Sequence, residues 1–218
     1  MNKVPQNKYA ANLPWKRLTW LMDFVICGLV IHWIFQGILY MDRSEKLFKV
    51  LLDFLLTVGI GFLLISWFPW IFAIPFAFLI AHTLNFLFNG QLWVLMKIYG
   101  RVDQNYSEFA TYFMELSRRI KAEKSVGFAA VYGSQVRGEW KPTSDLDVRL
   151  VRKAGIFNAF RSCIFVTMER TRALFHKFPL DIYILDSFTP LMRMRGDEIP
   201  LIICDFIDYS NQKLIQKE

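Results

Sequence analysis

Two aspartates two positions apart, Asp145 and Asp147, are the side chains best suited by type and spacing to chemistry. They enter an apolar run, Leu146 to Val151, whose length and β-branched content predict a buried strand. Side chains two apart on a strand share a face and lie about 6.6–7 Å apart along it. Paired carboxylates of this kind suit hard divalent cations, and two such ions about 3.5–4 Å apart support in-line phosphoryl chemistry.

The elements before the aspartates must position them. An earlier apolar run, Val126 to Tyr132, predicts another buried strand, and it ends at Gly133-Ser134. A basic loop that contains glycine and proline then leads back to Ser144 and the two aspartates. Because glycine has no Cβ, Gly133 allows a sharp turn whose backbone can approach a phosphate closely.

This order of residues resembles the signature of the DNA polymerase beta superfamily of nucleotidyltransferases, and its minimal, kanamycin-nucleotidyltransferase-like branch most of all. The matching residues are Gly133-Ser134, Arg137-Gly138 and Ser144-Asp145-Leu146-Asp147-Val148. The family has a third carboxylate on a later strand that follows a helix, and Asp181, in the apolar run Phe178 to Leu185, occupies that position. The resemblance extends from about Ser107 to about Ser210.

The resemblance implies a role for each matching residue. The predicted catalytic residues and metal ligands are Asp145, Asp147 and Asp181, which would hold two Mg²⁺ ions or Mn²⁺, with Asp181 also the general base. Ser134 and the N–H groups of the turn would hold the β- and γ-phosphates of an NTP. The predicted nucleotide-binding set is Gly133, Ser134, Arg137, Ser144 and Arg149. Within it Arg137 braces the turn or touches the triphosphate, and Ser144 looks structural.

Arg149 departs from the family, which usually has an apolar residue at this position. By the alternation of a strand it shares the face of Asp145 and Asp147. It can therefore reach a phosphate or an anionic acceptor, or form a salt bridge to an acidic neighbour, and both roles stay open. Two further interpretations apply to the whole stretch: a turn between strands with solvated carboxylates, or a descendant that has lost catalysis.

The composition divides the chain into a membrane region and a soluble region. Residues 1–100 hold 8 Lys and Arg and 4 Asp and Glu, whereas residues 101–218 hold 18 and 15. Apolar residues make up 54% of the chain, more than a soluble globule normally has. The net charge of +7 comes without a long basic run with interleaved aromatics, so it favours anionic lipid headgroups over nucleic acid. The cysteines have no paired or metal-type spacing.

Residues 1–99 predict a helical transmembrane region with three spans, at about 18–40, 50–68 and 71–95, before a domain at 100–218. Stretches of this length can cross a hydrocarbon core of about 30 Å. The first is less regular, because it contains Asp23, His32 and Gln36, so lying in the interface and re-entering are alternatives to crossing. The third carries His82, Asn85 and Asn89 on one stripe, which indicates interhelical hydrogen bonds or a headgroup site.

Charge predicts the orientation of these spans. The charge-free turn at Pro69-Trp70 is expected outside, which puts the loop 41–49 and everything after Lys97 in the cytoplasm. The basic N-terminus conflicts with three full crossings. The expected location is the plasma or inner membrane, as a multi-pass protein with a cytoplasmic catalytic domain. Asp53, near the start of the second span, is expected to be solvated or paired with Lys49.

The soluble half and the resemblance together predict an α+β nucleotidyltransferase domain with a small mixed sheet and flanking helices. After a hinge at Gly100 to Asn105, a helix is expected to about Glu123, and a crossover helix from Ile156 to His176. Asp186, five residues after Asp181, is expected on the other face of its strand. Residues 188–218 are expected to form a short helical or extended tail.

The function favoured by these observations is a membrane-anchored, metal-dependent nucleotidyltransferase. It would move an NMP from an NTP to a hydroxyl or phosphate of a lipid-linked sugar, a headgroup or a membrane protein. The expected partners are NTP and membrane lipids, with no nucleic acid, and a homo-oligomer is compatible with the sequence. The alternatives are an antitoxin-like enzyme that modifies a partner protein, and a non-catalytic nucleotide-sensing membrane subunit.

Overall fold

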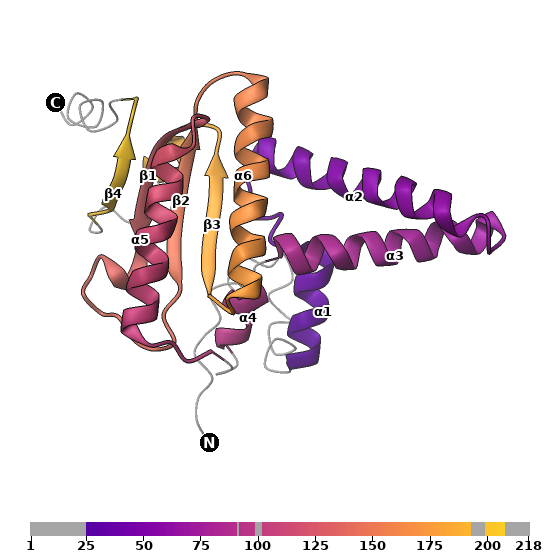
Figure 1. Ribbon diagram of the computed structural model, residues 1–218, viewed down its shortest axis with the longest axis horizontal. Coiled ribbons are helices and arrows are strands. Elements are labelled where there is room, and N and C mark those ends of the chain that lie inside the picture. Colours follow the sequence, from indigo (N-terminus) through magenta and orange to yellow (C-terminus); the bar gives the residue numbers. More distant parts are fainter. Residues whose placement is uncertain (1–24, 91, 99–101, 193–198, 208–218) are drawn as a thin grey trace.

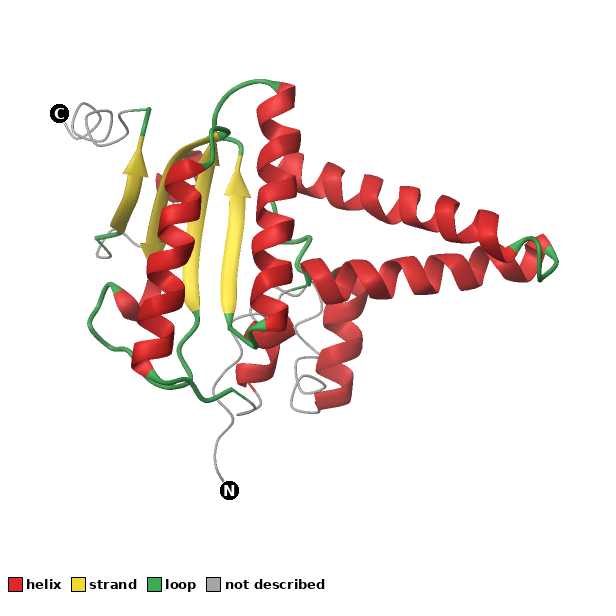
Figure 2. Cartoon of the chain, viewed as in Figure 1, coloured by secondary structure: helices red, strands yellow, loops and turns green. Residues whose placement is uncertain are grey.

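The computed structural model describes residues 25–90, 92–98, 102–192 and 199–207. They form a four-stranded sheet with helices packed against one face and a long helical hairpin that projects from the side of the sheet (Figure 1). Figure 2 shows the same division between the layered domain and the all-helical hairpin.

The sheet is small and mixed, as predicted. Its strands are β1 (Val126–Tyr132), β2 (Leu146–Arg152), β3 (Leu180–Leu185) and β4 (Leu201–Asp205), in the spatial order β3-β2-β1-β4. β1 is antiparallel to both β2 and β4, whereas β2 and β3 are parallel and are joined by α6 (Ile156–Phe175). A parallel pair needs such a crossover, so the helix between the aspartate strands follows from their direction. β4 lies in the stretch expected as a tail, which also contains the short α7 (Thr189–Met192).

The main core lies between the sheet and two helices, α5 (Tyr106–Ala122) and α6. On α5 the apolar residues Phe109, Leu116 and Ile120 recur at helical spacing and are at most 1% exposed. Each such side chain contributes about 1.5–3 kcal/mol when it leaves water. Asn105 caps this helix by accepting a hydrogen bond from the Ser107 amide at 3.0 Å. All seven residues of β1 are buried, as its continuous apolar run predicts.

The hairpin consists of α2 (Arg43–Leu64) and α3 (Trp70–Asn89). Both helices are long and apolar enough to cross a bilayer, with mean hydropathies of 2.2 and 2.0 over their most apolar windows. Only 11% and 28% of those windows are buried, so most of this apolar surface is exposed. Length and composition are the evidence for a membrane here.

The described residues contain two candidate spans, whereas three were predicted. The described part of the first predicted span is α1 (Val25–Phe35), 11 residues that stop before Gln36 and Gly37, which both have positive φ. The predicted third span is interrupted after α3 by Gly90, and α4 (Leu92–Ile98) follows as a separate short helix. Residues 18–24 of the first predicted span, and Gly100 of the predicted hinge, lie outside the described residues.

The base of the hairpin is fixed to the edge of the sheet at β3. Glu45 accepts a hydrogen bond from the Ile184 amide at 3.1 Å, and Arg170 of α6 donates to the Ile182 carbonyl. Asp42 accepts from the Asp186 amide at 2.8 Å, while Asp186 accepts from the Ser44 amide at 3.0 Å. An edge strand leaves backbone groups without partners, and here side chains of the hairpin and of α6 satisfy them.

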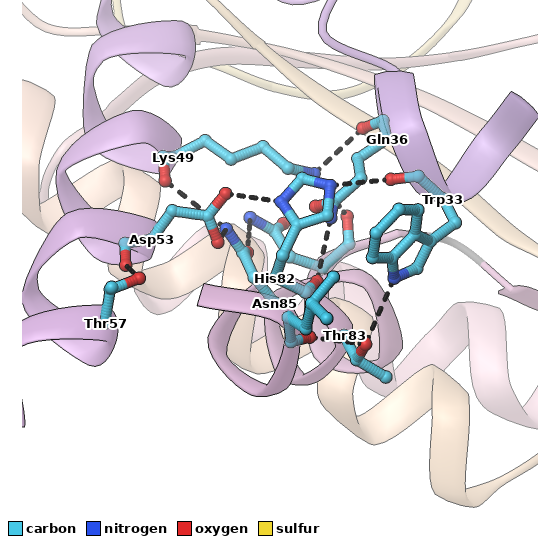
Figure 3. Close-up of polar contacts among 10 residues, drawn as sticks. Trp33, Gln36, Lys49, Asp53, Thr57, His82, Thr83 and Asn85 are labelled. Carbon is cyan, nitrogen blue, oxygen red and sulfur yellow. Dashed lines mark hydrogen bonds and ion pairs between the residues drawn. The ribbon is translucent and has the colours of Figure 1, made fainter. Parts of the chain in front are cut away.

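A polar cluster joins α1, α2 and α3 close to this base (Figure 3). His82 lies between Asp53 Oδ2, at 2.7 Å from Nδ1, and the Trp33 carbonyl, at 2.9 Å from Nε2. Asn85 donates to Asp53 Oδ1 at 2.8 Å, and Lys49 donates to the Gln36 carbonyl at 2.8 Å. The prediction that Asp53 is solvated or paired with Lys49 is therefore wrong, and the stripe of His82 and Asn85 makes interhelical hydrogen bonds.

Candidate active site

The strand register brings the predicted catalytic residues to one line across the sheet. Asp147 of β2 pairs with Tyr132 of β1 on one side and with Asp181 of β3 on the other. Because Gly133 directly follows Tyr132, the Gly133-Ser134 turn also lies at this end of the sheet. Asp145 precedes the first residue of β2, so it belongs to the loop that enters the strand.

Gly133 occupies a position that no other residue fits without strain. Its φ of +83° lies in the left-handed region. A Cβ at this position would also overlap Oδ2 of Asp147. The turn, which forms a short 3₁₀ segment η3 (Gly133–Gln135), therefore sits directly against the middle carboxylate.

The loop between β1 and β2 is braced by serine side chains. Ser134 Oγ donates to Ser144 Oγ at 3.1 Å, and Ser144 Oγ accepts from the Lys141 amide at 2.9 Å. This is the structural contact expected for Ser144. Arg137 donates to Glu139 at 2.9 Å in an exposed ion pair. Contact of Ser134 or Arg137 with a triphosphate stays a prediction.

Asp181 is ionised by its surroundings. Arg149 pairs with Asp181 Oδ2 at 3.0 Å and also donates to the Asp181 carbonyl at 2.9 Å. Burial alone would raise the pKa of Asp181, but the attraction of Arg149 and the hydrogen bonds of the carboxyl outweigh it and lower that pKa. Of the two roles open to Arg149, the structure contains the salt bridge. The guanidinium also lies over the Tyr183 ring, 4.9 Å from its centroid.

Asp147 has the opposite electrostatic character. Its pKa is raised well above the ordinary aspartate value by burial first, and then by the negative charges of Asp145 and Asp181. The two neighbouring carboxyl groups of Asp147 and Asp181 interact, and Asp181 Oδ1 is buried without a hydrogen-bond donor among the described residues. Carboxylates in such contact need a proton or a cation between them.

Asp145 is paired with a residue that sequence reasoning missed. Lys97 of α4 lies 2.5 Å from Asp145 Oδ1, and both side chains are about one-fifth exposed. α4 is held at this end of the domain because Trp93 donates to the Leu174 carbonyl, at the end of α6, at 2.8 Å. The only available signal in the sequence was a lysine at the end of an otherwise apolar stretch.

The arrangement thus brings together all three predicted aspartates, but two of them contact basic side chains of the chain itself. Within the part of the chain that the structure describes, no group of three or more His, Cys, Asp or Glu side chains is arranged to hold a metal ion. Asp147 and Asp181 form the closest approach to such a group. The metal role of the three aspartates stays a prediction.

Comparison with protein families gives an independent finding. Residues 113–172 match the family described as a nucleotidyltransferase domain. The matched stretch includes most of α5 and α6, both β1 and β2, the Gly133-Ser134 turn, Asp145 and Asp147, and it ends before Asp181. No curated protein matches the chain. Together with the mixed sheet and its flanking helices, this match supports a likeness to the polymerase beta-like nucleotidyltransferase superfamily over residues 113–172.

Proposed function

We propose that the chain is a membrane-anchored, metal-dependent nucleotidyltransferase that moves an NMP from an NTP to a hydroxyl or phosphate acceptor at the bilayer surface. The observation that carries the proposal is the alignment of Asp147 with Asp181 on adjacent parallel strands, beside a glycine turn that a Cβ would close. This juxtaposition would put a backbone suited to phosphate binding next to two carboxylates of contrasting pKa. Such contrasting pairs are typical of catalytic sites.

The residues fit a divalent cation. Asp147 and Asp181 would hold it, since they are close, buried and short of one positive partner. Asp145 would join them when Lys97 withdraws. Bound Mg²⁺ or Mn²⁺ ions, two of them in this proposal, neutralise the phosphoryl oxygens and lower the pKa of a coordinated nucleophile.

The chain's own groups supply the remaining steps. The backbone at Gly133 and the hydroxyl of Ser134 bind the β- and γ-phosphates and orient the α-phosphate. Arg149 keeps Asp181 ionised, so Asp181 can accept the proton of the acceptor hydroxyl. Asp181 is 7% exposed, so water has little access to this carboxylate.

The position of the hairpin supports an acceptor in the membrane layer. α4 follows α3 after one turn and is packed against the catalytic end, so the domain is not suspended on a long linker. With α2 and α3 in the bilayer, the catalytic end would stay close to its surface. We place the domain on the cytoplasmic side, where NTPs are available, and the acceptor is then a lipid-linked sugar, a headgroup or a membrane protein.

A second candidate function is a nucleotide-sensing membrane subunit without turnover. The observation that favours it is the occupation of two carboxylates by Lys97 and Arg149, at 2.5 and 3.0 Å. If these pairs persist when a nucleotide binds, the chain binds NTP without transferring it.

The test is transfer of label from each of the four α-labelled NTPs by the full chain in lipid nanodiscs, with Mg²⁺ or Mn²⁺. The expected result is labelled lipid or labelled membrane protein with the wild type and none with Asp145→Ala/Asp147→Ala. Asp103→Ala, an exposed carboxylate near the start of α5, is the matched control and retains transfer. Absence of label with every NTP, while the wild type still binds NTP, contradicts the enzyme and supports the sensor.

A further inference from the structure

α6 has an apolar outer face that the domain does not use. Its inner face packs on the sheet, with Cys163, Val166 and Ala173 at most 4% exposed. On the outer side, large apolar residues recur at helical spacing and are between 38% and 87% exposed. These residues are Ile156, Phe157, Phe160, Ile164, Met168 and Phe175. Thr167 and Thr171 also lie on this stripe, and the Arg161 and Arg172 side chains beside it, 56% and 42% exposed, are paired with Glu123 and Glu169. The outer face is therefore mostly apolar over about 30 Å of helix.

α5 provides the internal standard for this observation. It packs on the same face of the same sheet and is nearly as long, 17 residues against 20. Its exposed side is mostly polar and charged, with Glu108, Glu115, Arg118 and Lys121, and Met114 as an exposed large apolar residue. A helix that covers a sheet in water normally has such a polar outer face. The outer face of α6 is therefore suited to a different environment.

The apolar face of α6 is continuous with the hairpin. Phe48 of α2 contacts Phe160 of α6, with ring centroids 5.6 Å apart, and Phe88 of α3 contacts Phe175 at 6.4 Å. The bases of α2 and α3 therefore contact the exposed apolar side of α6. They leave the domain on the side of α6 and run away from the sheet (Figure 1). Exposed basic side chains, Arg43 and Lys46, lie where α2 leaves the domain.

We propose that the outer face of α6 lies flat in the headgroup layer of the bilayer into which the hairpin inserts. This inference rests on the membrane anchoring in the proposed function and extends it, because a second, separate surface then contacts lipid. An interfacial helix buries its apolar face about 5–10 Å into the boundary between headgroups and acyl chains. Arg43 and Lys46 would meet anionic headgroups at the same level.

The consequence for the enzyme is a fixed height of the active site above the membrane. Asp181 follows the end of α6 by only one turn and the first residue of β3. If α6 is parallel to the surface, the starts of β2 and β3 are held near that surface. An acceptor group attached to a lipid can then reach Asp181 without leaving the bilayer.

The test uses the full chain with Cys27, Cys163 and Cys204 replaced by alanine, and single cysteines introduced for an environment-sensitive fluorophore. Phe157→Cys, at a site 87% exposed, probes α6, and Met114→Cys, at a site 63% exposed, is the matched control on α5. Trp67→Cys, at the hairpin tip and 82% exposed, reports insertion of the hairpin. Each protein is reconstituted in vesicles of phosphatidylcholine and phosphatidylglycerol that contain nitroxide lipids.

The expected result is a blue-shifted emission at position 157, quenched more by shallow than by deep nitroxides, and unchanged emission at position 114. A lipid-inserted label at position 67 with a solvent-exposed label at 157 overturns this inference and leaves the membrane anchoring intact. A solvent-exposed label at position 67, together with extraction of the protein by alkaline carbonate, overturns the anchoring itself. A blue shift at 157 that depends on protein concentration and not on lipid shows that a second copy covers α6, which also overturns the inference.

Discussion

Two clusters of buried or half-buried charge, one at the base of the hairpin and one at the end of the sheet that carries the predicted catalytic aspartates, differ in how the charges are balanced. At the base of the hairpin Glu45 pairs with Arg170 at 2.6 Å and Asp53 pairs with His82 at 2.7 Å. At the catalytic end three aspartates share two basic side chains, and Asp181 Oδ1 has no donor among the described residues. The first cluster has a basic side chain for each of these two carboxylates, although Gln36 Oε1, Glu45 Oε1 and Arg170 Nε have no hydrogen-bond partner among the described residues. The second cluster has one more acidic than basic side chain.

On this difference in charge balance we assign the first cluster to structure and propose a function for the second. An excess of carboxylates at one site favours a proton or a cation there, and carboxylates perturbed in this way are typical of functional sites. Side chains at the hairpin base form hydrogen bonds with the backbone of the β3 edge and fix the hairpin to the sheet, which is a structural role. The catalytic end leaves Asp147 with a raised pKa between two other carboxylates. The predictions below test this contrast, from the largest effect to the smallest.

Asp147→Asn is expected to reduce nucleotidyl transfer by about 10³-fold or more, because it removes a charge that must face the phosphoryl group and its ions. The same change is expected to raise the melting temperature of the ligand-free chain. Asp147 has a raised pKa, so its contribution to stability is present at low pH and is lost as pH rises through that pKa. Each pKa unit corresponds to about 1.4 kcal/mol, or about 3–6 °C for a chain of this size.

The measurement combines label transfer with thermal unfolding of the chain without divalent ions at pH 5 to 8. Asp181, whose pKa is lowered, contributes in the opposite sense, because its stabilisation is lost only as pH falls through the lowered value. The increase in melting temperature of the Asp147→Asn variant over the wild type should therefore grow with pH across this range. A lower melting temperature of the variant than of the wild type at pH 8 would show that the charge of Asp147 is balanced without a ligand. The contrast with the hairpin base would then be wrong.

Glu45→Ala is expected to destabilise the chain by about 3 kcal/mol, because it leaves the charge of Arg170, whose side chain is 1% exposed, without its carboxylate partner. It also removes the acceptor of the Ile184 amide. Denaturant unfolding in one detergent measures the change, and kcat/KM well below the midpoint should stay close to that of the wild type. Lys46→Ala, at an exposed neighbour, is the control and should change stability by less than about 0.5 kcal/mol.

A double change sharpens this second prediction. Glu45→Met/Arg170→Met replaces both charges by apolar groups of similar length, and such replacements of a buried pair are often neutral. Recovery of most of the lost stability would assign the pair to structure. A large loss of transfer with preserved stability in Glu45→Ala would instead place this pair in the catalytic machinery.

The sequence predicted the catalytic sheet well because its signals are local. β1 is one uninterrupted apolar run, α5 and α6 keep a helical spacing, and the observed bounds agree with the prediction within a residue or two. Asp145 and Asp147 stood out by their spacing, and Asp181 through the family resemblance. β4 was missed because it is short, and Leu201 and Ile202 are about half exposed, so it has neither a buried run nor a clear alternation.

Contacts between distant segments were the part that local patterns could not predict. Asp53 was expected beside Lys49, four residues earlier on the same helix, but its partner is His82 of the other arm. Asp186 was expected only to leave the face of Asp181, and in the structure it exchanges hydrogen bonds with residues at the start of α2. Such pairs depend on how helices meet the sheet edge, which no periodicity of one segment encodes.

Lys97→Met is expected to have the smallest effect, a tightening of divalent ion binding by about 3–10-fold in the absence of nucleotide. The Lys97 ammonium lies 2.5 Å from Asp145 and competes with a metal ion for that carboxylate. Partly exposed ion pairs contribute only about 0–1 kcal/mol, which sets the modest size of the effect. Titration with Mn²⁺, followed by its electron paramagnetic resonance signal, measures the affinity, and Lys141→Met, at an exposed lysine of the β1–β2 loop, is the control. If Lys97→Met weakens Mn²⁺ binding instead, Lys97 orders the carboxylates rather than occupying their cation site. The contrast in charge balance between the aspartate cluster and the hairpin base would then be smaller than we infer.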